Sequence, residues 1–175
     1  LKNTAVNWGN TTRFSATGDI INATNPENLE LDIRNYSAKT IKSDITKFVN
    51  ENDLGVTLPQ NITMEGNLKG SLQNLKTNSK ITTSQGIATI NGKFNNTNTI
   101  AFDATIKVED YNLNELLQNK VLGNLSVTID AKGQGKTINS LDATLDATVS
   151  NFGYNNYAIK DLKLTGNVKN GKGSV

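Results

Sequence analysis

The sequence predicts a mainly β protein built around one long antiparallel sheet. Apolar and polar residues alternate with a period of two along 62–68, 100–108, 125–131, 141–149 and 162–168. Each run places its apolar side chains on one side of a strand and its polar side chains on the other, as in an antiparallel sheet with one wet face. Short turn-forming segments between the runs indicate a meander of consecutive strands.

The turns are predicted from small, polar and glycine-containing segments. They are Ser84-Gln85-Gly86, Phe94-Asn95-Asn96-Thr97-Asn98, Gln134-Gly135-Lys136 and Asn155-Asn156. Only two prolines, Pro26 and Pro59, interrupt the chain, so long stretches can hydrogen-bond without losing an N–H donor.

Two segments depart from the period of two. In 43–50 and in 112–119, apolar residues recur at helical spacing. The N-cap candidates are Ser43 and Asp44 in the first segment and Asn112 or Asn114 in the second. Each helix is about two turns long and would be unstable alone in water, so we expect each to pack on the sheet.

The helical segments occupy matching places in a repeat. Leu54-Gly55 and Leu122-Gly123 follow them, about 68 residues apart. The predicted unit is a short helix, a Leu-Gly stop and several strands. We therefore expect residues 1–175 to form a single repeat-built β domain. Its approximate units are 1–42 (partial), 43–110 and 111–175 (partial).

Composition argues against most kinds of catalysis. The chain has no cysteine and no histidine, which removes thiol nucleophiles, thiolate metal sites and the commonest general base. Its 18 basic and 16 acidic residues are scattered singly, whereas nucleic-acid binding needs a dense basic face. We expect no enzymatic activity, no cofactor, no metal site and no nucleic-acid partner.

Some residues allow either a structural or a functional interpretation. A lone Trp8 is more often a packing anchor than a ligand platform, and Asp142 and Asp146 are better explained as a solvated strand face than as a catalytic pair. The chain begins at Leu1 with neither a signal peptide nor an apolar run long enough to span a bilayer, so we expect it to be part of a longer chain.

The apolar strand faces pose the main functional question. Apolar residues make up only 35% of the chain, and helices able to cover a broad sheet are scarce. The sheet can close on itself as a sandwich or barrel, or it can curve into an open apolar trough. An open trough needs an apolar occupant, because large exposed apolar patches usually mark binding sites. Periodicity alone favours closure.

Three stretches of the sequence resemble the AsmA-like/TamB family of Gram-negative envelope proteins, in the style of its Bacteroidota members. The first is Ser-Asp-Ile-x-x-Phe at 43–48, then Leu58-Pro59 and Ile62-x-Met64-x-Gly66-x-Leu68-x-Gly70-x-Leu72. The second is Leu113-x-x-Leu116-Leu117, then Leu122-Gly123-Asn124-Leu125 and Ala131-Lys132-Gly133-x-Gly135. The third is Tyr154-Asn155-Asn156-Tyr157, then Leu162-x-Leu164-x-Gly166-x-Val168-x-Asn170-Gly171. The resemblance covers about three quarters of the chain.

The resemblance implies a periplasmic β-sheet rod, anchored in the inner membrane by the parent chain and curled into a hydrophobic groove. It implies phospholipid or other acyl chains as ligands and, through the parent chain, an outer-membrane barrel of the TamA/BamA type as partner. The chain would be an internal length of the rod that conducts phospholipid between the two membranes and supports outer-membrane biogenesis.

With this resemblance, we expect a long, curved antiparallel sheet forming an apolar groove, with two short helices. The residues expected to line the lipid groove are Ile62, Met64, Leu68, Ile100, Phe102, Ile106, Leu125, Val127, Ile129, Leu141, Leu145, Val149, Leu162 and Leu164. Two alternatives remain. One is a scaffold that captures strands of outer-membrane proteins during their assembly. The other is a closed β domain of a surface adhesin.

Overall fold

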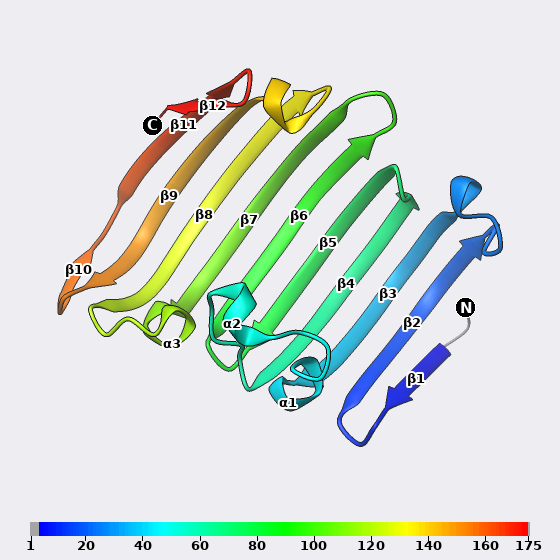
Figure 1. Cartoon of the computed structure of the whole chain (residues 1–175), viewed down its shortest axis with the longest axis horizontal. Coiled ribbons are helices and arrows are strands. Elements are labelled where there is room, and N and C mark those ends of the chain that lie inside the picture. Colours follow the sequence, from blue (N-terminus) through cyan, green and yellow to red (C-terminus); the bar gives the residue numbers. More distant parts are fainter. Residues whose placement is uncertain (1–3, 175) are drawn as a thin grey trace.

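Twelve antiparallel strands form one open, curved sheet (Figure 1). The structure is a computed structural model that describes residues 4–174, except the side chains of Asn52, Ile138 and Ser174. The strands are β1 (Thr4–Trp8), β2 (Thr12–Ile21), β3 (Glu30–Ile41), β4 (Asn61–Ser71), β5 (Asn74–Thr83), β6 (Gly86–Asn96), β7 (Ile100–Asn112), β8 (Leu122–Gly135), β9 (Asp142–Tyr154), β10 (Tyr157–Ile159), β11 (Leu162–Lys169) and β12 (Lys172–Ser174).

The predicted meander is confirmed. Each strand pairs with the next along the chain, except that β10 and β11 both pair with β9. All five predicted strand runs lie in strands, although β9 begins one residue after Leu141. The tightest predicted turn is also confirmed, because Asn155 and Asn156 join β9 to β10 with φ of 48° and 66°. Positive φ at both central residues is the geometry that asparagine favours in hairpins.

The helical segments are shorter than predicted. Residues 43–50 do not form one two-turn helix: a single turn, α1 (Lys42–Ile45), is followed by a separate turn, α2 (Glu51–Leu54). The N-cap of α1 is Ile41, which makes no side-chain cap, so Ser43 and Asp44 are not its caps. The second segment contains α3 (Leu113–Leu117), and here Asn112 is the cap, accepting a hydrogen bond from the Glu115 N–H at 3.2 Å.

Two single-turn 3-10 helices complete the structure, η1 (Pro26–Asn28) and η2 (Ile138–Ser140). As expected, the short α-helices lie against the sheet, α1 beside β3 and α3 beside β8. Within residues 4–174, no helix is long and apolar enough to cross a membrane.

The sheet does not close, so the closure favoured by periodicity alone is wrong. The accessible surface is 11594 Å², against about 8,300 Å² for a compact folded chain of this mass. Among the described residues, no large side chain is fully buried. The main buried cluster consists of Val127, Ala147 and Val149, with partly buried neighbours on β7, β8 and β9. The excess surface fits one sheet that lacks a second layer over its apolar face.

Candidate functional site: an open apolar groove

Four rows of side chains run across the strands on the apolar face. Directly paired residues of neighbouring strands lie on the same face, so the register defines each row. The first row is Phe14, Ala38, Met64, Ile81, Ala88, Val108, Val127, Val149 and Leu162. The second is Ala16, Tyr36, Gly66, Ser79, Ile90, Ile106, Ile129, Ala147 and Leu164.

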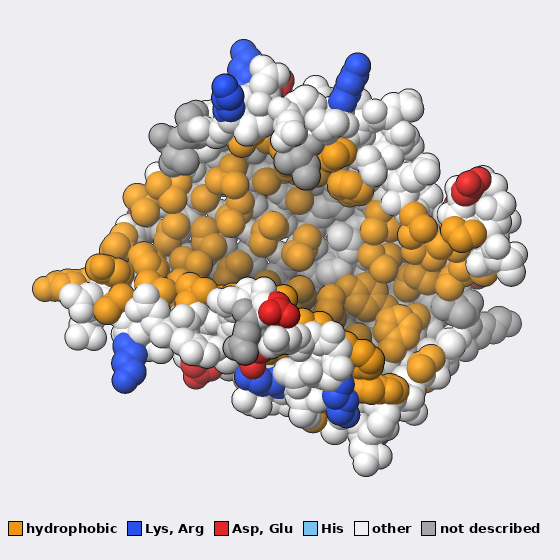
Figure 2. Space-filling model, viewed as in Figure 1, with side chains coloured by type: hydrophobic (Ala, Val, Ile, Leu, Met, Phe, Trp, Pro, Cys, Tyr) orange, Lys and Arg blue, Asp and Glu red, His pale blue; other side chains and the backbone are white. Residues whose placement is uncertain are grey.

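The other two rows lie nearer the opposite ends of the strands. The third row is Gly18, Ile33, Leu68, Thr77, Gly92, Ala104, Ala131, Leu145 and Gly166. The fourth is Ile20, Leu31, Gly70, Leu75, Phe94, Phe102, Gly133, Ala143 and Val168. Together the rows line a hollow between two polar borders (Figure 2). We call this hollow the groove.

The residues predicted to line a groove lie on this one face. Thirteen of the fourteen belong to strands in the register just described, and Leu141 lies beside the end of β8, next to Gly135. Several are well exposed for large apolar side chains: Leu145, Leu162 and Leu164 are each 40% accessible. Val127 and Val149, by contrast, belong to the buried cluster, each 7% accessible. The structure therefore brings the predicted residues together on one face, while their role as lipid contacts stays a prediction.

The sequence reasoning missed the first third of the groove. Phe14, Ala16 and Ile20 on β2, with Leu31 and Ile33 on β3, share the apolar face. A β-bulge between Ile33 and Tyr36 hides this pattern, because it moves the apolar positions of β3 from odd to even numbers. Allowing one extra residue in the alternation would have revealed this strand.

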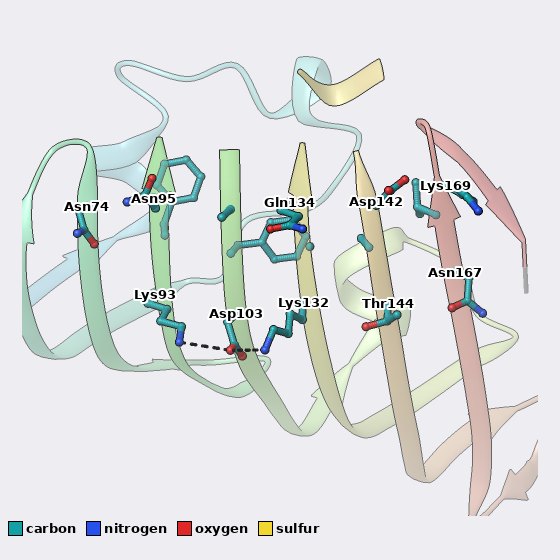
Figure 3. Close-up of a pocket in the computed structure, with 16 residues that line it drawn as sticks. Asn74, Lys93, Asn95, Asp103, Lys132, Gln134, Asp142, Thr144, Asn167 and Lys169 are labelled. Carbon is teal, nitrogen blue, oxygen red and sulfur yellow. Dashed lines mark ion pairs between the residues drawn. The ribbon is translucent and has the colours of Figure 1, made fainter. Parts of the chain in front are cut away.

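The opposite face of the sheet is polar and charged. Lys93 and Lys132 each lie 3.5 Å from Asp103, so one carboxylate on β7 pairs with lysines on both neighbouring strands (Figure 3). Arg34 pairs with Asp19 at 3.0 Å across β2 and β3. Asp146 accepts a hydrogen bond from the Thr165 hydroxyl at 3.1 Å, in keeping with the predicted solvated face. These charged and polar side chains keep the face opposite the groove in contact with water.

A hollow of about 890 Å³ lies where the fourth row crosses β6 to β11. Its apolar lining includes Phe94, Phe102, Ala143 and Val168. The Phe102 ring lies over Gly133, because a Cβ on that glycine would stand 2.7 Å from the ring carbon Cζ. Figure 3 shows the polar residues of the same strands around this hollow. The aromatic ring thus fills space that glycine leaves on the neighbouring strand.

One border of the groove is bridged by the segment between β3 and β4. Thr57 in this segment reaches the β7–β8 connection, where its N–H donates to the Leu116 carbonyl at 2.7 Å and its hydroxyl accepts from Gln118 at 2.8 Å. Within the segment, Lys42 pairs with Glu51 at 2.7 Å, and the Leu58 N–H also donates to Glu51. Both contacts lower the pKa of Glu51, Lys42 being the larger cause.

At its start, the bridging segment is fixed to the β1–β2 hairpin. The buried Asp44 carboxylate accepts hydrogen bonds from the hydroxyls of Thr11 and Thr12 and from Lys47, the last at 2.9 Å. These contacts, with the Thr11 hydroxyl the largest cause, lower the pKa of Asp44 to about 2. The Trp8 ring contacts Phe48 in a tilted arrangement, with ring centroids 5.1 Å apart and an interplanar angle of 47°, and the Lys47 ammonium lies 4.8 Å from the Trp8 ring centre. Trp8 is therefore a packing anchor here.

We expect acid to release this anchor. The folded-state pKa of Asp44 lies below its ordinary value of 3.8, so its stabilising contribution is present above about pH 4 and is lost as the pH falls towards 2. Trp8 is the only tryptophan, so its fluorescence should shift to the red over that pH range. Asp44→Asn should give the shifted emission already at pH 7. An emission spectrum of the variant identical to that of the unaltered protein would contradict this role for Asp44.

Among the described residues, no group of three or more His, Cys, Asp or Glu side chains could hold a metal ion. Comparison with protein-family models, curated proteins and solved structures finds no match for the chain. The functional argument therefore rests on the geometry of the groove and on the resemblance seen in the sequence.

Proposed function

We propose that the groove binds the acyl chains of lipids, which lie across the strands along the four rows. The observation that supports this proposal is the length of uncovered apolar surface. The rows run from β2 to β11, and no second sheet or long helix covers them among residues 4–174. Monomeric proteins rarely expose contiguous apolar surface of this extent without a partner for it.

The wider role follows from the resemblance to the AsmA-like/TamB family. On that basis, the chain is an internal segment of a periplasm-spanning envelope protein whose parent chain is anchored in the inner membrane. The ligand would be phospholipid moving between the inner and outer membranes, and the partner an outer-membrane barrel of the TamA/BamA type. The chain would thereby support outer-membrane biogenesis.

The physical properties of the groove suit movement of a lipid as well as its binding. Apolar contact is non-directional and its free energy scales with the buried area, about 25 cal/mol per Å². A chain that slides by one strand exchanges similar contacts, for example Ile106 for Ile129 in the second row. No side chain needs to react, and the steps between Ile90, Ile106 and Ile129 are similar in energy.

The proposal predicts saturable binding of a fluorescent fatty acid such as cis-parinaric acid. Fluorescence titration of the purified protein should give a plateau in proportion to protein, and native mass spectrometry should show bound lipid after exposure to phospholipid vesicles. Heat-unfolded protein provides the control. Folded protein that neither carries lipid nor binds the probe would overturn the proposal. That result would favour the strand-capturing scaffold.

A further inference from the structure

Three hydroxyl groups interrupt the apolar floor of the groove at one place. In the four rows between β2 and β11, the residues with polar side chains are Tyr36 and Ser79 in the second row and Thr77 in the third. All three lie on β3 and β5, on either side of Gly66 in β4. We call these three residues the hydroxyl cluster.

The hydroxyl cluster is one hydrogen-bonded unit. The Tyr36 hydroxyl donates to the Ser79 oxygen at 2.6 Å, across Gly66, which has no side chain to obstruct the contact. The hydroxyls of Thr77 and Ser79 are 2.7 Å apart, and Thr77 donates to the Asn67 carbonyl at 3.1 Å. Ser79 is only 6% accessible. The cluster is therefore built into the floor of the groove.

The cluster lies at the start of the apolar part of the second row. Beyond Ser79 the second row continues with Ile90, Ile106, Ile129, Ala147 and Leu164. Five strand spacings of about 4.8 Å make this track about 24 Å long. An extended long-chain acyl group that lies along it would place its oxygen-bearing end beside the cluster.

The chemistry of the hydroxyl cluster determines which polar group of a lipid it can bind. Burying an ester or hydroxyl oxygen in an apolar groove is unfavourable unless it is hydrogen-bonded. The three hydroxyl protons are already donated within the cluster or to the Asn67 carbonyl, so a ligand hydroxyl can donate to a remaining lone pair of the cluster. A ligand ester oxygen can accept when a rotating hydroxyl exchanges its partner in the cluster for the ligand. The charged side chains that pair across these strands, such as Asp32 and Lys69, alternate to the opposite face. The site therefore suits an uncharged oxygen function.

We propose that the hydroxyl cluster binds the neutral ester or hydroxyl end of an acyl lipid whose chain lies along the second row. This inference rests on the proposed function of the groove. It adds a fixed starting position and a substrate class, namely acyl esters and acylglycerols, to a surface that would otherwise bind any apolar chain of suitable length.

The test compares ligands that share a chain length but differ in their polar end. Monopalmitoylglycerol, methyl palmitate and hexadecane are each used to displace cis-parinaric acid from the unaltered protein and from the variant Tyr36→Phe/Thr77→Val/Ser79→Ala. The variant removes three hydroxyls and keeps the ring over Gly66. We expect the preference for monopalmitoylglycerol over hexadecane to fall about tenfold in the variant, the effect of losing about one or two hydrogen bonds.

Thr82→Val is the matched control, because Thr82 lies on the same strand and on the opposite face. It should leave the preference unchanged. A matching loss for methyl palmitate would identify the ester oxygens as the bound group, whereas a loss limited to monopalmitoylglycerol would identify its free hydroxyls. An unchanged preference in a folded triple variant would overturn the inference. Absence of probe binding in every protein would instead overturn the proposed function.

Discussion

Ile129→Asp is expected to abolish acyl-chain binding while the sheet stays folded. Ile129 lies in the second row between Ile106 and Ala147, at the middle of the apolar track. Ile129 packs in part against the buried Val127 cluster, so the variant loses some packing, but it is only partly buried and water in the open groove still reaches a carboxylate there. A bound acyl chain would bury the charge without a partner, at a cost of several kcal/mol. A loss of about 3 kcal/mol corresponds to roughly 100-fold weaker binding.

The measurements for Ile129→Asp are a melting curve and a fatty-acid titration on the same preparation. Phe102→Asp provides a second groove variant at the fourth row. Thr128→Asp is the control, because Thr128 neighbours Ile129 on the polar face and pairs with Lys107 on β7. Unfolding of Ile129→Asp alone would show that Ile129 is needed for the packing of the Val127 cluster. Unfolding of both groove variants would contradict an open groove. A folded variant with unaltered binding would remove Ile129 from the groove.

The sequence was sufficient for the strands that alternate without interruption. From residue 61 onwards, one face of each long strand except β5 is apolar over most of its length, and the predicted runs lie in β4, β7, β8, β9 and β11. Strand pairing between consecutive neighbours then follows from short turns. The alternation of apolar and polar residues also places thirteen predicted groove residues on one face. This follows because regularly paired strands keep their apolar side chains on the same side of the sheet.

Openness of the sheet could not be read from periodicity. A sandwich and a trough have the same alternation within each strand, and they differ only in what covers the apolar side. The strong exposure of residues such as Leu162 and Leu164 decides between them, and exposure is a tertiary property. The resemblance to an envelope family was the observation in the sequence that favoured a trough.

The helical prediction at 43–50 failed for a related reason. Asp44 has the position and chemistry of an N-cap, but its carboxylate accepts hydrogen bonds from Thr11 and Thr12, more than thirty residues away. Phe48, which local spacing assigns to the sheet-facing side of a helix, is largely exposed and contacts Trp8 instead. Contacts with the β1–β2 hairpin thus replace a second helical turn.

The hydroxyl cluster was equally invisible in the sequence. Thr77 and Ser79 look like ordinary polar positions of an exposed strand. Only the pairing of Ser79 with Ile90 on one side and Gly66 on the other places them on the apolar face. Tyr36 follows the bulge in β3, which obscures its face as well. Polar residues at apolar positions become informative once the register is known.

Gly66→Ala is expected to destabilise the sheet by about 1–3 kcal/mol, the usual range for overpacking. A Cβ at this position would stand 2.2 Å from the Asn78 carbonyl oxygen and 2.8 Å from the Ser79 Cα. Both atoms belong to the backbone of β5, so neither can rotate away and the strands β4 and β5 must separate. Separation would also stretch the hydrogen bond that joins Tyr36 to Ser79 across this glycine.

Urea denaturation should therefore show a lower midpoint for Gly66→Ala, together with a loss of the preference for monopalmitoylglycerol. Gly173→Ala is the matched control, since its Cβ would meet only the Val168 side chain at 4.0 Å, and its midpoint should not change. The two readouts test different consequences of one contact. A lower midpoint with an intact ligand preference would show that the strands adjust around the methyl group while the hydroxyl cluster survives. An unchanged midpoint would contradict the close approach of β4 and β5 at Gly66, on which the geometry of the hydroxyl cluster depends.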